Sequence, residues 1–306
     1  MQKYLFFILV LFLWGSSDSL WAYPIFPRTL SDVYKEADYV VYGKVVGFID
    51  DSPPTSKDGV PPPPSMHDGF AVIVIHEELK GEITETQICI ADQRSFMCPE
   101  PFHFEEGQEV LLFLNKDRKA NFYWTFAMSY GGKEVTAEEY SLYKKKLLDL
   151  QAILDQSNQE IQEQQYIDWV VNCIKEPLTR WDGIFDLLNE KEGANKELVA
   201  IPYVLTQKQK EALCLDLYQQ QELRVMDFKL IPHIRGAQDP VLLQFLLNKM
   251  KKLPNTADTD DLFLDAASVI ADLSSRADLK KLSNQIEEEK LSKKGRALIR
   301  QFRQIM

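Results

Sequence analysis

The hydrophobic pattern of this chain changes its period once, near residue 135, and this change limits the possible folds more than any other feature. Before it, short runs rich in β-branched and aromatic residues alternate with loops that carry Gly, Pro, Asp or Asn. After it, apolar residues recur every three or four positions, the spacing of one face of a helix. A strand-rich part followed by an all-α part predicts a multi-domain α+β protein.

The first part contains five strand candidates, at residues 38–49, 70–81, 86–92, 109–116 and 121–127. The fourth of them, EVLLFLNK, has apolar residues at consecutive positions, so both of its faces must be covered. A five-stranded OB-type β-barrel meets this requirement, because one face of the strand lies in the barrel core. The helix that follows the strands can cover the other face.

The second part begins with a capping box, in which Thr136 precedes Glu139 by three residues. Seven further segments with helical spacing follow, and Asp239 and Asp278 each open one of them. Between these two aspartates, three alanines form a small-residue spine on which paired helices can stack: Ala266, Ala267 and Ala271. This organisation resembles HEAT-like helical repeats, so we expect an all-α, helical-repeat-like domain.

Length and charge restrict the number of domains and the kind of partner. A chain of 306 residues with 45% hydrophobic composition is long enough for two ordinary domains. Its 35 Lys and Arg residues against 46 Asp and Glu residues give a net charge of -11. This charge repels phosphate backbones, so we expect no nucleic-acid partner.

The N-terminus has the pattern of a secretory signal peptide. One lysine precedes an apolar run from Tyr4 to Trp14, and small and polar residues follow as far as Ala22. The run is too short to span a bilayer, which takes about 20 residues. We therefore expect residues 1–22 to be cleaved near Ala22, no transmembrane segment in the mature chain, and a secreted or periplasmic protein.

Export makes the four cysteines candidates for disulfide bonds. Of the three possible pairings, we expect Cys89 with Cys98 and Cys173 with Cys214, because each pair then stays inside one domain. The alternative is that some of these cysteines are buried free thiols.

The order of the motifs EADYVVYGKVVGF, AVIVIHEELKG and CPEPFHFEEGQEVLLFL, followed by an aromatic strand, resembles the netrin-like domain, the fold of tissue inhibitors of metalloproteinases. The resemblance implies a netrin-like barrel with its C-terminal helix over residues 23–157, and the helical spacing beyond it predicts a helical domain over 158–306. These inhibitors chelate zinc through a mature N-terminal cysteine, whereas this chain is expected to begin at Tyr23. The resemblance therefore implies the fold but not the zinc-chelating inhibition.

Patterns for catalysis and metal binding do not match this sequence. His76 opens HEELK, but a zinc helix of the H-E-x-x-H type needs histidine where Lys80 stands. The acidic run DTDDLFLD has Leu262 and Phe263 where a calcium loop needs a ligand and a glycine. The sequence contains neither a G-x-S-x-G motif nor a glycine-rich phosphate loop. We expect no enzyme activity, no catalytic residue, no metal site and no cofactor.

Two segments are candidates for contact with a partner. Apolar residues in the loop before the fourth strand can form a wedge at the barrel rim: Phe96, Met97, Pro99 and Phe102. The alternative is that the helical domain of the same chain covers them. A proline run between the first two strands can present a preformed polyproline helix, the alternative being a tolerated insertion: Pro61, Pro62, Pro63 and Pro64.

These observations favour a secreted or periplasmic protein-binding function, through the barrel rim or the concave face of the helices, with an unknown protein as partner. Two alternatives remain open at the level of sequence. One is an exported hydrolase with an unrecognised site at the domain junction, and the other is a structural component of the cell envelope.

Overall fold

The computed structural model describes residues 27–50, 67–95, 100–117, 122–188, 204–235, 239–254, 256–274, 276–289 and 292–306. Backbone contacts divide the chain into two compact units. The barrel unit contains Asp38–Glu134, and the helical unit contains Arg28–Ala37 together with Val135–Met306. In chain order, the barrel is therefore an insertion into the helical unit.

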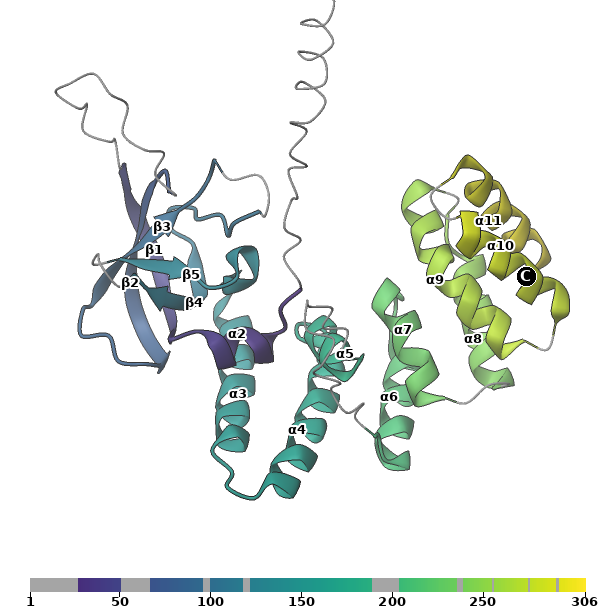
Figure 1. The fold of residues 1–306 in the computed structure, drawn as a ribbon, viewed down its shortest axis with the longest axis horizontal. Helices are drawn as coiled ribbons and strands as arrows, with labels where there is room; N and C mark the ends of the chain where they lie inside the picture. Colours follow the sequence, from purple (N-terminus) through teal and green to yellow (C-terminus); the bar gives the residue numbers. More distant parts are fainter. Residues whose placement is uncertain are drawn as a thin grey trace, which may run out of the picture. The chain divides into compact units, whose positions relative to one another are not determined.

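The strands of the barrel unit form one sheet with the order β1-β2-β3-β5-β4-β6, and Figure 1 labels β1 to β5. A further pairing of β1 with β4 closes the first five strands into an OB-like barrel, in which β3 and β5 run parallel and the other neighbours antiparallel. The α+β class and the five predicted strands are confirmed, whereas β6 was not predicted. The strands are β1 Tyr39–Asp50, β2 Gly69–Lys80, β3 Gln87–Asp92, β4 Glu109–Lys116, β5 Tyr123–Thr125 and β6 Gly132–Glu134.

The burial of β4 on both of its faces explains its unusual sequence. Val110, Leu112 and Leu114 point into the barrel core. Leu111 and Phe113 alternate with them on the opposite face and are also fully buried. A strand buried on both faces needs apolar residues at consecutive positions, as predicted for EVLLFLNK. The rest of the core comes mainly from the other strands and includes Val41, Val45, Ala71, Ile73, Ile88, Ile90, Phe104 and Tyr123.

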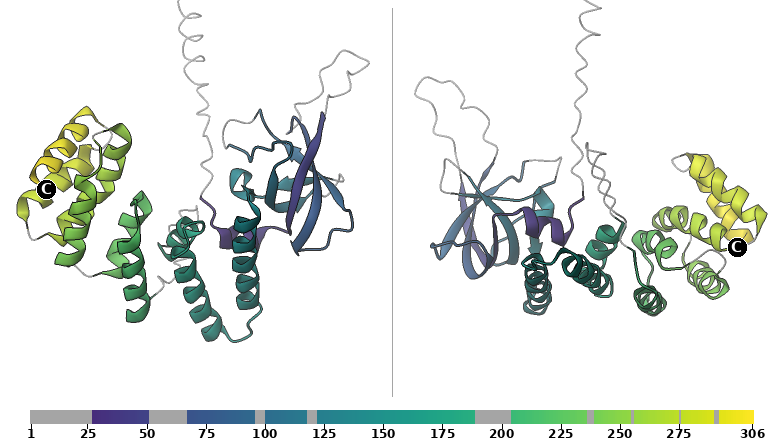
Figure 2. Two further views of the ribbon diagram at one scale, coloured as in Figure 1. Left: turned by 180° about the vertical axis from the view of Figure 1, so that it is seen from behind. Right: turned by 60° about the horizontal axis from the view of Figure 1, so that its bottom comes forward.

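Ten α-helices make up the described part of the helical unit (Figures 1 and 2). Successive helices pack in pairs, α4 with α5, α6 with α7, α8 with α9 and α10 with α11. The second helices of the pairs also contact one another along the row α5, α7, α9, α11. The helices are α2 Leu30–Glu36, α3 Ala137–Leu154, α4 Gln159–Ile174, α5 Arg180–Leu188, α6 Gln207–Gln219, α7 Val225–Ile234, α8 Pro240–Lys251, α9 Ala257–Leu273, α10 Ala277–Glu289 and α11 Lys293–Ile305.

This stack of helix pairs fits the predicted all-α region. The three alanines of the expected spine, Ala266, Ala267 and Ala271, are buried in α9, which packs against α7, α8, α10 and α11. Small side chains at these positions allow one helix to contact several neighbours closely. The assignment to HEAT-like repeats remains a prediction.

Helix α3 lies in the helical unit, whereas the predicted boundary after residue 157 placed it with the barrel. Its side chains explain the difference, because α3 and α4 are linked in both directions. Lys146 Nζ donates to the backbone oxygen of Asn172 at 2.8 Å, and Trp169 Nε1 donates to the backbone oxygen of Lys146 at 2.9 Å. Helical periodicity predicted the position of α3 in the sequence, but it could not predict that α3 packs against α4 through these hydrogen bonds.

The segment LSDVYKE predicts a short helix capped by Ser31, but the N-cap of α2 is Thr29, which forms a capping box with Asp32. The Ser31 hydroxyl instead accepts a hydrogen bond from the hydroxyl of Tyr166 in α4 at 2.8 Å. Helix α7 was not predicted, because it contains Pro232, a residue that usually interrupts a helix.

The predicted disulfide between Cys173 and Cys214 is wrong, since both are buried free thiols. The two side chains have other neighbours. Cys173 on α4 packs close to Gly183 of α5, and burial raises its pKa to about 12. Cys214 Sγ accepts a hydrogen bond from Arg235 Nε at 2.9 Å. Cys89 is also a free thiol, and Cys98, its predicted partner, lies outside the described residues.

Candidate functional site

The outer face of the barrel carries aromatic residues at the start of β2 and at β5. Side chains alternate along a strand, and Ala71 and Tyr123 belong to the barrel core. Their neighbours Phe70, Phe122 and Trp124 therefore point outward. Strand β3 lies between β2 and β5, so aromatic residues from two non-adjacent strands are brought together on one face.

Four rings form a contiguous cluster, which we call the aromatic platform: His67, Phe70, Phe122 and Trp124. The ring centroids of Phe70 and Phe122 are 5.1 Å apart, as are those of Phe122 and Trp124. The His67 ring lies 4.6 Å from Phe70 and 5.8 Å from Trp124. These separations are typical of aromatic pairs that stabilise each other. All four side chains are half-buried, so part of each faces solvent.

The small residue Ala91 explains how the platform lies across three strands. Ala91 is paired with Phe70 in the sheet and points outward, since its neighbour Ile90 is in the core. It is nevertheless only 2% exposed. A methyl group between two aromatic strands leaves room for the rings of Phe70 and Phe122 to meet above β3.

Two carboxylates flank the platform. Asp117 Oδ2 accepts a hydrogen bond from Trp124 Nε1 at 3.4 Å. Asp68 is exposed, and its Oδ2 accepts the backbone N–H of Ser95 at 2.6 Å. The hydrogen bonds from Ser95 lower the pKa of Asp68, and the charges of Arg94 and His67 act in the same direction. Asp68 is therefore ionised at neutral pH.

A buried acid lies on the inner side of the same barrel end. Asp92 is 1% exposed, and burial raises its pKa, although the nearby Arg94 charge opposes the shift. Arg94 Nε lies 2.5 Å from Asp92 Oδ2, and its guanidinium also stacks over Phe48, 4.6 Å from the ring centroid. Asp92 and Phe48 thus hold the side chain of Arg94.

Of the predicted contact residues, only Phe102 lies within the described part of the chain. Its half-buried ring packs against the barrel core, 5.0 Å from the ring of Phe104. A side chain at Gly132 would overlap the Phe102 ring. The structure therefore shows Phe102 packed within the barrel unit. The other predicted contacts lie outside the described residues: Phe96, Met97, Pro99, Pro61, Pro62, Pro63 and Pro64.

The platform was not predicted from the sequence, although the sequence contains a pattern that indicates it. Phe122 and Trp124 flank the core residue Tyr123, and Phe70 precedes the core residue Ala71. Aromatic residues at outward positions of two strands were visible in the sequence. Their contact was not visible, because it depends on the sheet order that places β3 between β2 and β5.

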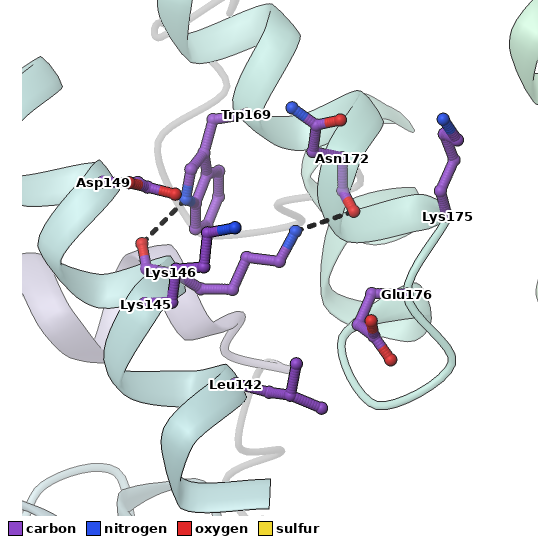
Figure 3. A pocket seen from close by; sticks show the side chains of 8 residues that line it. All are labelled: Leu142, Lys145, Lys146, Asp149, Trp169, Asn172, Lys175 and Glu176. Atoms are coloured by element: carbon purple, nitrogen blue, oxygen red, sulfur yellow. Dashed lines mark hydrogen bonds between the residues drawn. The ribbon is translucent and has the colours of Figure 1, made fainter. Parts of the chain in front are cut away.

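The helical unit contains a cavity of about 310 Å³ between α3 and α4 (Figure 3). It is lined mainly by polar side chains, and the two hydrogen bonds that link Lys146 to Asn172 and Trp169 cross it. These groups hold one helix against the other, so the cavity is explained by helix packing.

A second cavity of about 400 Å³ lies beside Arg180 at the start of α5. Arg180 is 5% exposed, and its Nε donates to Asp227 Oδ1 at 2.8 Å. Its Nη1 donates to the backbone oxygen of Ile174 at 2.7 Å and also bonds Asp216. The arginine thereby connects α5 to α6 and α7, and this network has a structural role.

Among the described residues, neither metal-binding groups nor membrane-spanning helices give a further candidate site. In the described part of the chain, no three His, Cys, Asp or Glu side chains come together as a set that could hold a metal ion. His76 on β2 lies 3.4 Å from Glu109 on β4 and forms a surface pair. None of the helices described above is both long and apolar enough to cross a membrane.

Comparison with known proteins adds no assignment, since neither a protein-family model nor a curated protein matches the chain.

Proposed function

We propose that this chain is an exported interaction protein that binds a polypeptide segment of another protein on the aromatic platform. The observation that carries the proposal is the contact of four half-buried rings on the outer face of β2, β3 and β5. Aromatic side chains contribute much of the energy of protein interfaces, because they bury large areas and lose little entropy. Single rings are common on surfaces, but a contiguous cluster suits recognition.

The net charge and the fold also favour a polypeptide as the ligand. The net charge of -11 disfavours nucleic acid as the ligand. OB barrels in general bind oligonucleotides and oligosaccharides across strands 2 and 3, and the platform extends over β2, β3 and β5, the same face of the barrel. Export follows from the expected signal peptide at residues 1–22. The netrin-like resemblance supports a protein partner, although the expected mature chain lacks the N-terminal cysteine that chelates zinc.

The test uses the chain from Tyr23 onward, immobilised and exposed to a random-peptide display library. Peptides selected by the wild type should bind the Trp124→Ala variant at least about tenfold more weakly, the loss expected for a central interface aromatic. The matched control is Trp181→Ala, which removes a half-buried tryptophan stacked on Phe185 in the helical unit. Circular dichroism checks that both variants are folded.

The proposal fails if the library yields no enriched peptide. It also fails if the enriched peptides bind the Trp124→Ala variant as tightly as the wild type.

A further inference from the structure

Two carboxylates lie at the aromatic platform. The carboxylate of Asp117 touches the edge of Trp124, and the ionised carboxylate of Asp68 lies beside His67, with which it interacts electrostatically. Both carboxylates are at least partly accessible to solvent. A ligand on the platform therefore meets aromatic faces and two anionic groups together.

Two basic residues near the platform in sequence make close contacts with other groups. Arg94 pairs with the buried Asp92 and stacks over Phe48. Lys116 lies over the ring of Tyr123, 5.2 Å from its centroid, and Tyr123 belongs to the barrel core. The charge of Arg94 also acts on Asp68 and lowers its pKa, so Arg94 offsets part of that negative charge.

Aromatic rings and carboxylates attract the same kind of ligand group. The face of an aromatic ring carries partial negative charge and attracts a cation within about 6 Å of its centroid. A carboxylate a few ångströms away adds a Coulomb attraction that water only partly screens. The hydrogen bond from Trp124 Nε1 to Asp117 also orients the indole, so that ring and carboxylate keep a fixed relation.

We propose that the platform accepts a basic side chain, arginine or lysine, of the bound polypeptide. This inference rests on the proposed function and names the chemistry of its partner: a segment with a cationic residue at the centre of the contact. The ring faces of Trp124 and Phe122 contact the cation and its aliphatic stem. Asp68 and Asp117 supply the opposite charge.

The experiment divides the display library into three pools, with arginine, glutamine or glutamate fixed at the central position. The arginine pool should be enriched at least about fivefold over the glutamine pool, and the glutamate pool should be depleted. This preference should fall as salt is raised from about 0.05 M to 0.5 M, because ions screen exposed charges.

Charge variants test the origin of the preference. The double variant Asp68→Asn, Asp117→Asn keeps oxygen acceptors for Ser95 and Trp124 but removes both charges. It should lose most of the preference for arginine and still enrich the glutamine pool. Arg118 and Lys119 lie outside the described residues, and Arg118→Gln with Lys119→Gln should preserve or increase the preference. A weaker preference for arginine in the variant that lacks Arg118 and Lys119 would contradict a cation site.

The outcomes separate the two proposals. Equal enrichment of the arginine and glutamine pools, both lost in Trp124→Ala, would leave the binding function standing and overturn the cationic partner. A preference for arginine that survives the double aspartate variant would also overturn it. The absence of enrichment in all three pools would overturn the proposed function itself.

Discussion

At the scale of single residues, the helical unit depends on charges that are buried together. Arg180 on α5 bonds Asp216, Asp227 and the backbone oxygen of Ile174, and it thereby joins α5 to α6, α7 and α4. Removal of one member leaves the others buried without a counter-charge, which costs roughly 3–5 kcal/mol. We expect Arg180→Met to lower the free energy of unfolding of the helical unit by about that amount, measured by urea denaturation followed through the helical circular dichroism signal.

The matched control for this prediction is Arg300→Met on α11. Arg300 is exposed, so the same chemical change should alter the free energy of unfolding by less than about 0.5 kcal/mol. Equal stabilities of the two variants would contradict the role given to the Arg180 network.

At the scale of elements, the start of α3 can be tested through its cap. The side chain of Thr136 accepts from the backbone N–H of Glu139, and the Glu139 carboxylate accepts the N–H of Thr136 at 2.8 Å. Thr136→Ala should reduce the free energy of unfolding by roughly 0.5–2 kcal/mol, again by urea denaturation. Ser141→Ala in the interior of α3 should be neutral or slightly stabilising, because Ser141 Oγ bonds only the preceding turn. A larger loss from Ser141→Ala would contradict this account.

The same cap predicts a dependence on pH. Hydrogen bonds from Thr136 lower the pKa of Glu139 below its usual value of 4.5. An acid whose pKa is lower in the folded state stabilises the fold above its unfolded pKa and loses that contribution as the pH falls through the folded pKa. Glu139→Gln should therefore reduce stability at pH 7 but make little difference near pH 3. A variant that costs the same free energy at both pH values would rule out the charge of Glu139 as the cause.

Elements whose signals are local could be predicted from the sequence, and this cap is one of them. The five barrel strands and eight of the helices from α3 to α11 were found through periodicity and loop residues. Features that depend on distant contacts could not be found. The platform needs the order of β2, β3 and β5, and the free state of Cys173 and Cys214 depends on how α4, α5, α6 and α7 pack. Helix α7 was missed because Pro232, which lies in its last turn, usually indicates the end of a helix or a loop.

At the scale of the whole molecule, the chain leaves the helical unit after α2 and returns to it at α3. The link is α2 itself, whose Thr29 hydroxyl donates to Asp186 at 2.8 Å, and whose Leu30 N–H donates to Asp182 at 2.7 Å. Both aspartates belong to α5 and are buried. The barrel strands nearest to its two ends, β1 and β6, both pair with β4, an arrangement compatible with an inserted domain.

This connectivity predicts which parts of the chain fold alone. Replacement of Asp38–Glu134 by a short Gly/Ser linker should leave a cooperatively folded helical unit, because α2 still reaches Asp182 and Asp186. A fragment that begins at Val135 lacks α2, and each acceptor left unsatisfied should cost about 1–3 kcal/mol. The urea midpoint of that fragment should therefore be clearly lower than that of the linker variant. If the two midpoints coincide, α2 does not contribute to the stability of the helical unit, and the division of the chain after residue 37 has no energetic meaning.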